Sequence, residues 1–299
     1  MSATPCSVLG ERHGDDLAAS APSASRFLLL EQPGPWRGRN AVTHSDLDEG
    51  VARELLARAD DAGVKVHLIR RSSRRAAAGP STCFLARTDR EDPWLERHAL
   101  AAPEAVLDLD LDAFGAGRPV EPSVAWHEPV YAVCTHGRRD PCCAARGRPL
   151  ARALRAARPG QTWEIGHIGG HRFAATFLAL PLGLAFGRVP AAAGPAIVAG
   201  LEAGRIALEH LRGRAGDPWA VQAADVLVRR RLGLRGPGDL AVEAVEPRGD
   251  HAALVRLRAA GGALLEAAVS RAADDGGRPV SCGGEPEPVD VFSLDLIRS

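Results

Sequence analysis

Two short segments of the chain contain the residues best suited to bind a metal. The first runs from a strand into a polar loop and contains Cys134 and Cys143, which are separated by eight residues. The second contains His167 and His171, and two of the three residues between them are glycines. Such glycines argue against a helical face and favour a loop wrapped around a ligand. Because thiolates and imidazoles together bind zinc, copper or iron, we expect these four residues to form a metal site.

The spacing leaves two kinds of metal centre open. Structural zinc sites usually take their first two ligands from a tight C-x2-4-C knuckle. The wider loop between Cys134 and Cys143 is better suited to a larger inorganic core, such as a [2Fe–2S] cluster. From the residues alone, a Cys2His2 zinc structural or interaction module and an iron–sulfur cluster both remain open.

Three strings in the sequence resemble the sucrase/ferredoxin-like family: LLLEQPGPW, CTHGRRDPCC and WEIGHIGGHRFA. The resemblance extends over roughly residues 26–299, and the two later strings are its specific part. It implies a thioredoxin-like ferredoxin whose single [2Fe–2S] cluster has Cys134, Cys143, His167 and His171 as ligands. On this basis we expect an electron carrier rather than a stand-alone enzyme, with an unknown redox partner protein.

The ligand set determines what such a cluster would do. Two neutral imidazoles in place of two thiolates make the oxidised centre less negative, so that it accepts an electron more easily. The same reasoning explains why Rieske centres lie at about −150 to +300 mV, whereas plant-type ferredoxins lie near −400 mV. The free ring N–H groups could also lose protons on oxidation, which would couple electron transfer to proton transfer.

Polar residues near the thiolates are candidates for orienting the ligands or donating to sulfide. They are His136, Arg138, Asp140 and Cys142. Cys142 stands directly before Cys143, and we prefer Cys143 as the ligand because it keeps the C-x8-C spacing.

Cys142 also belongs to a second motif. With Arg148 it matches C-x5-R, the spacing of a phosphate-binding nucleophile loop. A cysteine-dependent phosphatase or arsenate-type enzyme is therefore a further alternative. For Cys282 we expect a buried structural role, and no chemistry is assigned to Cys6 and Cys83.

The elements that must position these residues predict an α/β fold. The order strand, helix, strand, strand occurs twice, which is compatible with thioredoxin-like sheets covered by helices. The first copy is expected at 27–31, 45–62 (with Ser45 as N-cap), 64–69 and 82–86. The second is expected at 130–133, 149–157 and 162–168, followed by a hairpin of 173–180 and 184–189. A long helix is expected at about 195–211, and a helix at 218–231 precedes strands at 253–258 and 289–296.

We therefore predict three domains. Residues 1–120 form a thioredoxin-like-related domain without cluster ligands, since Gln32 and Gly34 stand where thiols would be needed. Residues 121–215 form the thioredoxin-like ferredoxin domain, and residues 216–299 form a small α+β module. The first 24 or so residues are expected to be loosely ordered.

Bulk composition excludes several functions. The 37 basic and 37 acidic side chains cancel, so no overall field points to nucleic acid or an anionic membrane. The longest apolar stretch is about 14 residues, too short for the roughly 20 that span a bilayer. Without a secretory signal, the six cysteines favour metal or redox chemistry over disulfides, and we expect a cytoplasmic protein.

Overall fold

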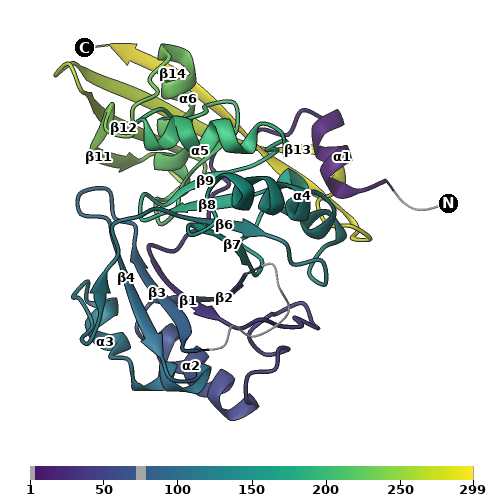
Figure 1. Cartoon of the computed structure of the whole chain (residues 1–299). Coiled ribbons are helices and arrows are strands. Elements are labelled where there is room, and N and C mark those ends of the chain that lie inside the picture. The colour runs from purple at the N-terminus through teal and green to yellow at the C-terminus, as the bar shows by residue number, and fades with distance from the viewer. Residues whose placement is uncertain (1–3, 72–78, 299) are drawn as a thin grey trace.

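The computed structural model describes residues 4–71 and 79–298 and has the α/β architecture that the sequence predicts (Figure 1). Ten strands form one mixed sheet and four form a second, antiparallel sheet. The order in the large sheet is β10 (Leu211–Arg214), β9 (Leu184–Phe186), β8 (Phe177–Leu180), β6 (Val130–Cys134), β7 (Thr162–Ile165), β2 (Lys65–Arg70), β1 (Arg26–Glu31), β3 (Ser81–Arg87), β4 (Trp94–Leu100) and β5 (Val124–Ala125).

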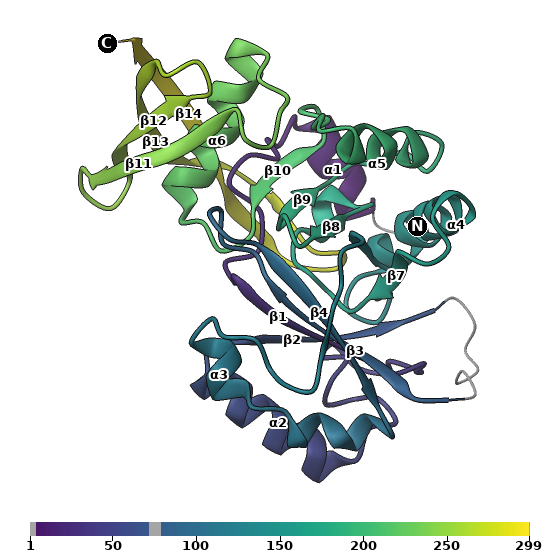
Figure 2. The same cartoon turned by 60° about the vertical axis from the view of Figure 1, so that its left-hand side comes forward.

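The large sheet consists of two units with the same connectivity. In the first, β1 is followed by α2 (Glu49–Asp61) and pairs in parallel with β2, while β3 and then β4 add antiparallel strands. In the second, β6, α4 (Pro141–Ala157), β7, β8 and β9 repeat this arrangement. The units meet where β2 and β7 pair antiparallel (Figure 2). The predicted strand-helix-strand-strand order is thus present twice, and the domain bounds at 120 and 215 stay a prediction.

Strand β1 illustrates why these segments form a sheet buried on both faces. Its side chains alternate, so that Leu28 and Leu30 join the core that contains Leu55 of α2. Phe27 and Leu29 join the core on the opposite face, which includes residues of β6 and β7. All four are fully buried, as expected for a continuous apolar run in a sheet covered on two sides.

Two helices begin at places other than predicted, and the capping residue explains both. α2 begins at Glu49 because the side chain of Asp48 accepts hydrogen bonds from Gly50 N and Val51 N, so the prediction of Ser45 as N-cap was wrong. α4 begins at Pro141, eight residues before the predicted start, because Asp140 caps it and Pro141 occupies the first turn. The cysteines at 142 and 143 therefore lie on a helix and not in a loop.

Further differences concern the ends of the units. The helix predicted over 195–211 is shorter, because α5 (Gly194–Glu202) ends before Gly204, whose φ of +72° takes it out of helical conformation. Strand β10 follows at the edge of the sheet. The start of the chain is also more ordered than expected. It contains α1 (Cys6–Arg12). In the first unit, η1 (Pro103–Asp108) and α3 (Leu111–Gly115) follow β4 and pack on the same core as α2.

The C-terminal segment is a four-stranded meander with α6 (Trp219–Leu232) packed on it, as the predicted α+β module requires. Its strands are β11 (Leu240–Pro247), β12 (Ala252–Ala259), β13 (Leu264–Pro279) and β14 (Pro286–Arg298). The turn between β13 and β14 extends beyond the sheet and lies beside α1 and α4 (Figure 1). Among the described residues, no helix has the length and apolarity needed to cross a membrane.

Candidate metal centre

Three of the four predicted ligands meet at one edge of the large sheet. Strands β6 and β7 are parallel neighbours, with Cys134 paired with Ile165, so their carboxyl ends lie at the same edge. Cys134 is the last residue of β6, and His167 follows β7 by two residues. Cys143 lies in the first turn of α4. Edges formed by the carboxyl ends of parallel strands are common places for binding sites.

The close approach of α4 to β6 depends on a glycine. A Cβ atom added at Gly147 would lie only 2.0 Å from the carbonyl oxygen of Cys134. Any other residue type would push the helix away from the strand, because the atom that its Cβ would meet belongs to the backbone of β6 and not to a flexible side chain. Gly147 therefore allows α4 to pack close enough to β6 for Cys143 to lie next to Cys134.

In this group the two thiols are buried, His167 is half-buried, and the donor atoms lie close together. The Nδ1 atom of His167 lies 3.9 Å from Cys134 Sγ and 3.7 Å from Cys143 Sγ. A hydrogen bond with Cys143, supported by His167, lowers the pKa of Cys134 well below its ordinary value. The same hydrogen bond and burial raise the pKa of Cys143. The two cysteines are thus suited to hold one thiolate and one thiol, and a bound metal would displace the proton of that thiol.

The fourth predicted ligand, His171, lies between this group and a second one. It begins the short helix η2 (His171–Phe173), after Gly169 and Gly170, which both have positive φ. Its ring centroid is 5.2 Å from that of His167. Its Nδ1 atom, however, is 3.5 Å from Asp140 Oδ2. Nδ1 also lies 3.7 Å from Cys6 Sγ, and Nε2 lies 3.3 Å from Ser281 Oγ. The ring therefore neighbours His167 on one side and a carboxylate, a thiol and a hydroxyl on the other.

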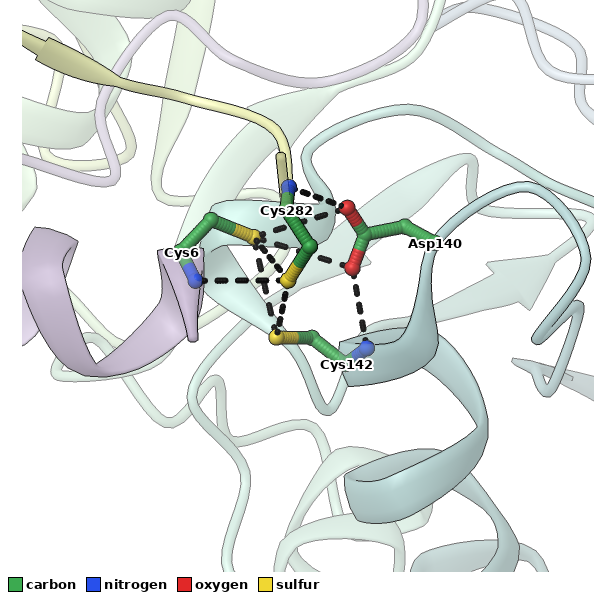
Figure 3. Close-up of side chains that lie close together, drawn as sticks. All are labelled: Cys6, Asp140, Cys142 and Cys282. Atoms are coloured by element: carbon green, nitrogen blue, oxygen red, sulfur yellow. Dashed lines mark hydrogen bonds between the residues drawn. The ribbon is translucent and has the colours of Figure 1, made fainter. Parts of the chain in front are cut away.

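The second group contains thiols that the sequence did not connect. Cys142 lies near Cys6 of α1 and Cys282 of the β13–β14 turn, with Asp140 beside them (Figure 3). Successive residues of a helix point about 100° apart, so Cys142 and Cys143 face different groups. Within each group, the donor atoms lie within 4.8 Å of one another. The first group consists of Cys134, Cys143 and His167, and the second of Cys6, Asp140, Cys142 and Cys282.

The placement of Cys142 also shows that the C-x5-R alternative was wrong. Cys142 and Arg148 both lie on α4, whereas a phosphate-binding nucleophile loop requires non-helical backbone between them. Arg148 and Arg138 instead line a cavity of about 670 Å³ that Cys142 does not reach.

His136 Nε2 contacts the carbonyl of Gly38 at 2.9 Å and so attaches the ligand loop to the first unit.

A buried arginine approaches the ligand thiols from β10. Arg212 is fully buried and donates to Ser20 Oγ at 3.1 Å and to the carbonyl of Gly169 at 3.4 Å. Burial lowers its pKa to about 10, and charge on Cys134 and Cys143 opposes that shift. The guanidinium therefore stays charged at neutral pH and places a positive charge beside the centre.

Fold and site together define an α/β protein with two groups of cysteine, histidine and aspartate side chains that can hold metal ions. Over residues 17–213 the sequence matches the model of the family described as sucrase/ferredoxin-like, and the chain belongs to this family. No curated protein and no solved structure matches the chain.

Proposed function

We propose that the chain is an electron-transfer protein that binds one [2Fe–2S] cluster through Cys134, Cys143, His167 and His171. The observation that carries this proposal is the convergence of two buried thiols, Cys134 and Cys143, with the half-buried His167 in a member of the sucrase/ferredoxin-like family. The ring of His171 lies beside that of His167 and supplies a second imidazole.

The donor set fits such a cluster. A two-iron core takes two protein ligands on each iron, and Rieske centres combine two thiolates with two imidazoles. Here α4 and β6 supply the thiolates, while the loop after β7 supplies the imidazoles. When bound, the cluster would accept and release one electron. The chain would exclude water from the thiolates, since Cys134 and Cys143 are each only 1% exposed.

A Cys2His2 zinc module is the second candidate. It is favoured by the short distances among Cys134, Cys143 and His167, whose donor atoms all lie within 4.8 Å of one another. Such distances also suit a single ion. The two candidates differ in iron and sulfide content, which can be measured directly.

We expect protein purified without oxygen to be red-brown and to contain about two iron and two acid-labile sulfide per chain. Reduction by dithionite should bleach the visible absorption and yield one electron spin per chain. Colourless protein in which zinc replaces iron, bound by the thiolates of Cys134 and Cys143, would contradict the cluster and support the zinc module.

Removing the positive charge of Arg212 should lower the reduction potential. At an effective dielectric constant near 20, Coulomb's law gives about 1–3 kcal/mol for a unit charge at a separation of about 5–15 Å. For one electron this range equals roughly 45–130 mV, because 59 mV corresponds to a tenfold change in equilibrium constant. We expect this decrease in Arg212→Met by redox titration, with Arg212→Lys, which keeps the charge, close to wild type. Equal potentials in all three proteins would show that the charge does not act on the centre.

A further inference from the structure

Three thiols from distant parts of the chain form a triangle next to the centre described above. Cys142 Sγ lies 3.6 Å from Cys6 Sγ and 3.4 Å from Cys282 Sγ. The remaining side, between Cys282 Sγ and Cys6 Sγ, is 3.6 Å. The three residues come from α4, α1 and the β13–β14 turn (Figure 3).

The dimensions of the triangle distinguish a metal site from a disulfide. A disulfide needs two sulfurs at about 2.05 Å and leaves the third thiol unpaired. Three thiolates bound to one zinc at about 2.3 Å in tetrahedral geometry lie about 3.8 Å from one another. All three sides resemble the second arrangement, so the thiols need only a small adjustment to bind one ion together.

The surroundings of the triangle are those of an organised site. Cys6 and Cys142 are 1% and 3% exposed. The hydroxyl of Ser7 donates to Cys142 Sγ at 3.3 Å, and the backbone N–H of Cys6 donates to Cys282 Sγ at 3.4 Å. Such donors orient thiolate ligands and offset part of their negative charge.

Asp140 supplies a fourth donor. Its Oδ1 accepts from the backbone N–H of Cys142 at 2.9 Å, and its Oδ2 accepts from that of Cys282 at 2.8 Å. Both oxygens lie 3.7 Å from Cys6 Sγ. Because each carboxylate oxygen has two lone pairs, one remains available after the N–H bond is formed. The carboxylate thus fixes the backbone of Cys142 and Cys282 and faces the thiol of Cys6.

We propose that Cys6, Cys142, Cys282 and Asp140 bind one zinc ion at a site separate from the centre of Cys134, Cys143 and His167. Zinc tolerates this mixed set because it prefers thiolates and imposes little geometry of its own. With four protein ligands the site is closed and therefore structural. It connects α1 and the β13–β14 turn to α4, and two of its thiols lie outside the family match of residues 17–213.

The test is the zinc content of the full chain, purified without oxygen and measured together with iron and sulfide. We expect one zinc per chain in addition to the iron. Cys6→Ala and Cys282→Ala should each lose at least about nine-tenths of the zinc, since each removes one of three thiolates. Iron, sulfide and the visible spectrum should remain near wild type in both variants. Cys83→Ala, which also deletes a buried thiol, should keep both metals.

Several outcomes would overturn the proposal. They are wild-type protein without zinc, zinc that persists in Cys282→Ala, a disulfide among the three thiols in anaerobic protein, and loss of iron together with zinc in Cys282→Ala. Zinc that is lost from Cys134→Ser but kept in Cys282→Ala would instead refute the iron cluster, so failures of the two sites are distinguishable.

X-ray absorption at the zinc edge of wild-type protein keeps the test independent of how the variants fold. We expect three sulfur neighbours at about 2.3 Å and one oxygen at about 2.0 Å. Two sulfurs with two imidazoles would place the zinc at the other group, and an imidazole in place of the carboxylate would overturn the assignment of Asp140.

Discussion

Cys134→Ser and Cys143→Ser should each reduce the iron and sulfide content to less than about a tenth of wild type, because each removes one of the four proposed cluster ligands. Both side chains are buried, and each Sγ lies within 4 Å of His167 Nδ1. A serine hydroxyl holds its proton far more tightly than a thiol, so it does not replace the thiolate. The measurement is iron and sulfide per chain together with the visible spectrum.

Cys142→Ser is the matched control for that pair. It makes the same chemical change one residue away on the same helix, but its side chain faces Cys6 and Cys282. The visible spectrum should therefore remain near wild type, while zinc is lost. A colourless Cys142→Ser protein beside a coloured Cys143→Ser protein would mean that the ligand is Cys142.

Gly147→Ala should both destabilise the fold and reduce cluster loading. The added Cβ would lie 2.0 Å from the carbonyl oxygen of Cys134, so α4 would have to move away from β6. Overpacking of a buried contact costs about 1–3 kcal/mol, and a contact between two backbone segments belongs at the upper end. Because Cys143 moves with α4, its sulfur would leave the position next to Cys134. We expect a clear fall in thermal midpoint and in iron per chain.

Gly200→Ala provides the control for this substitution. Gly200 also lies inside a helix, α5, but a Cβ there meets nothing closer than the carbonyl oxygen of Arg205 at 3.4 Å. Alanine is favoured over glycine in helices by roughly 0.5–1 kcal/mol, so this variant should be as stable as wild type or slightly more stable. If the two variants were equally stable, the proximity of α4 and β6 would not depend on Gly147.

Much of the fold was predictable because local pattern and burial agree. The run 27–31 is apolar at nearly every position and forms β1, a strand buried on both faces. Strand β4 was missed, since its sequence WLERHAL mixes polar and apolar residues. The start of α4 differs from the predicted residue 149, because Asp140 and Pro141 begin the helix and Pro149 lies inside it.

The candidate site was predictable only where its residues are near neighbours in sequence. The spacing of Cys134 and Cys143 and of the two histidines indicated the first group. Nothing local connects Cys6 with Cys282, which are 276 residues apart and meet only through the packing of α1 and the β13–β14 turn on α4. For Cys282 the sequence predicts only a buried structural thiol, which does not identify its partners, and in the structure this residue is half-buried.

The distance along the chain between Cys6 and Cys282 also sets an order of events during synthesis. The four residues proposed for the [2Fe–2S] cluster lie between 134 and 171, so they leave the ribosome well before Cys282 does. The triangle of thiols stays incomplete until residue 282 has been translated. A nascent chain arrested before residue 282 would contain every proposed cluster ligand but only two of the three thiols, and α1 would lack its attachment to the C-terminal hairpin. Attachment of the hairpin therefore follows synthesis of every proposed cluster ligand.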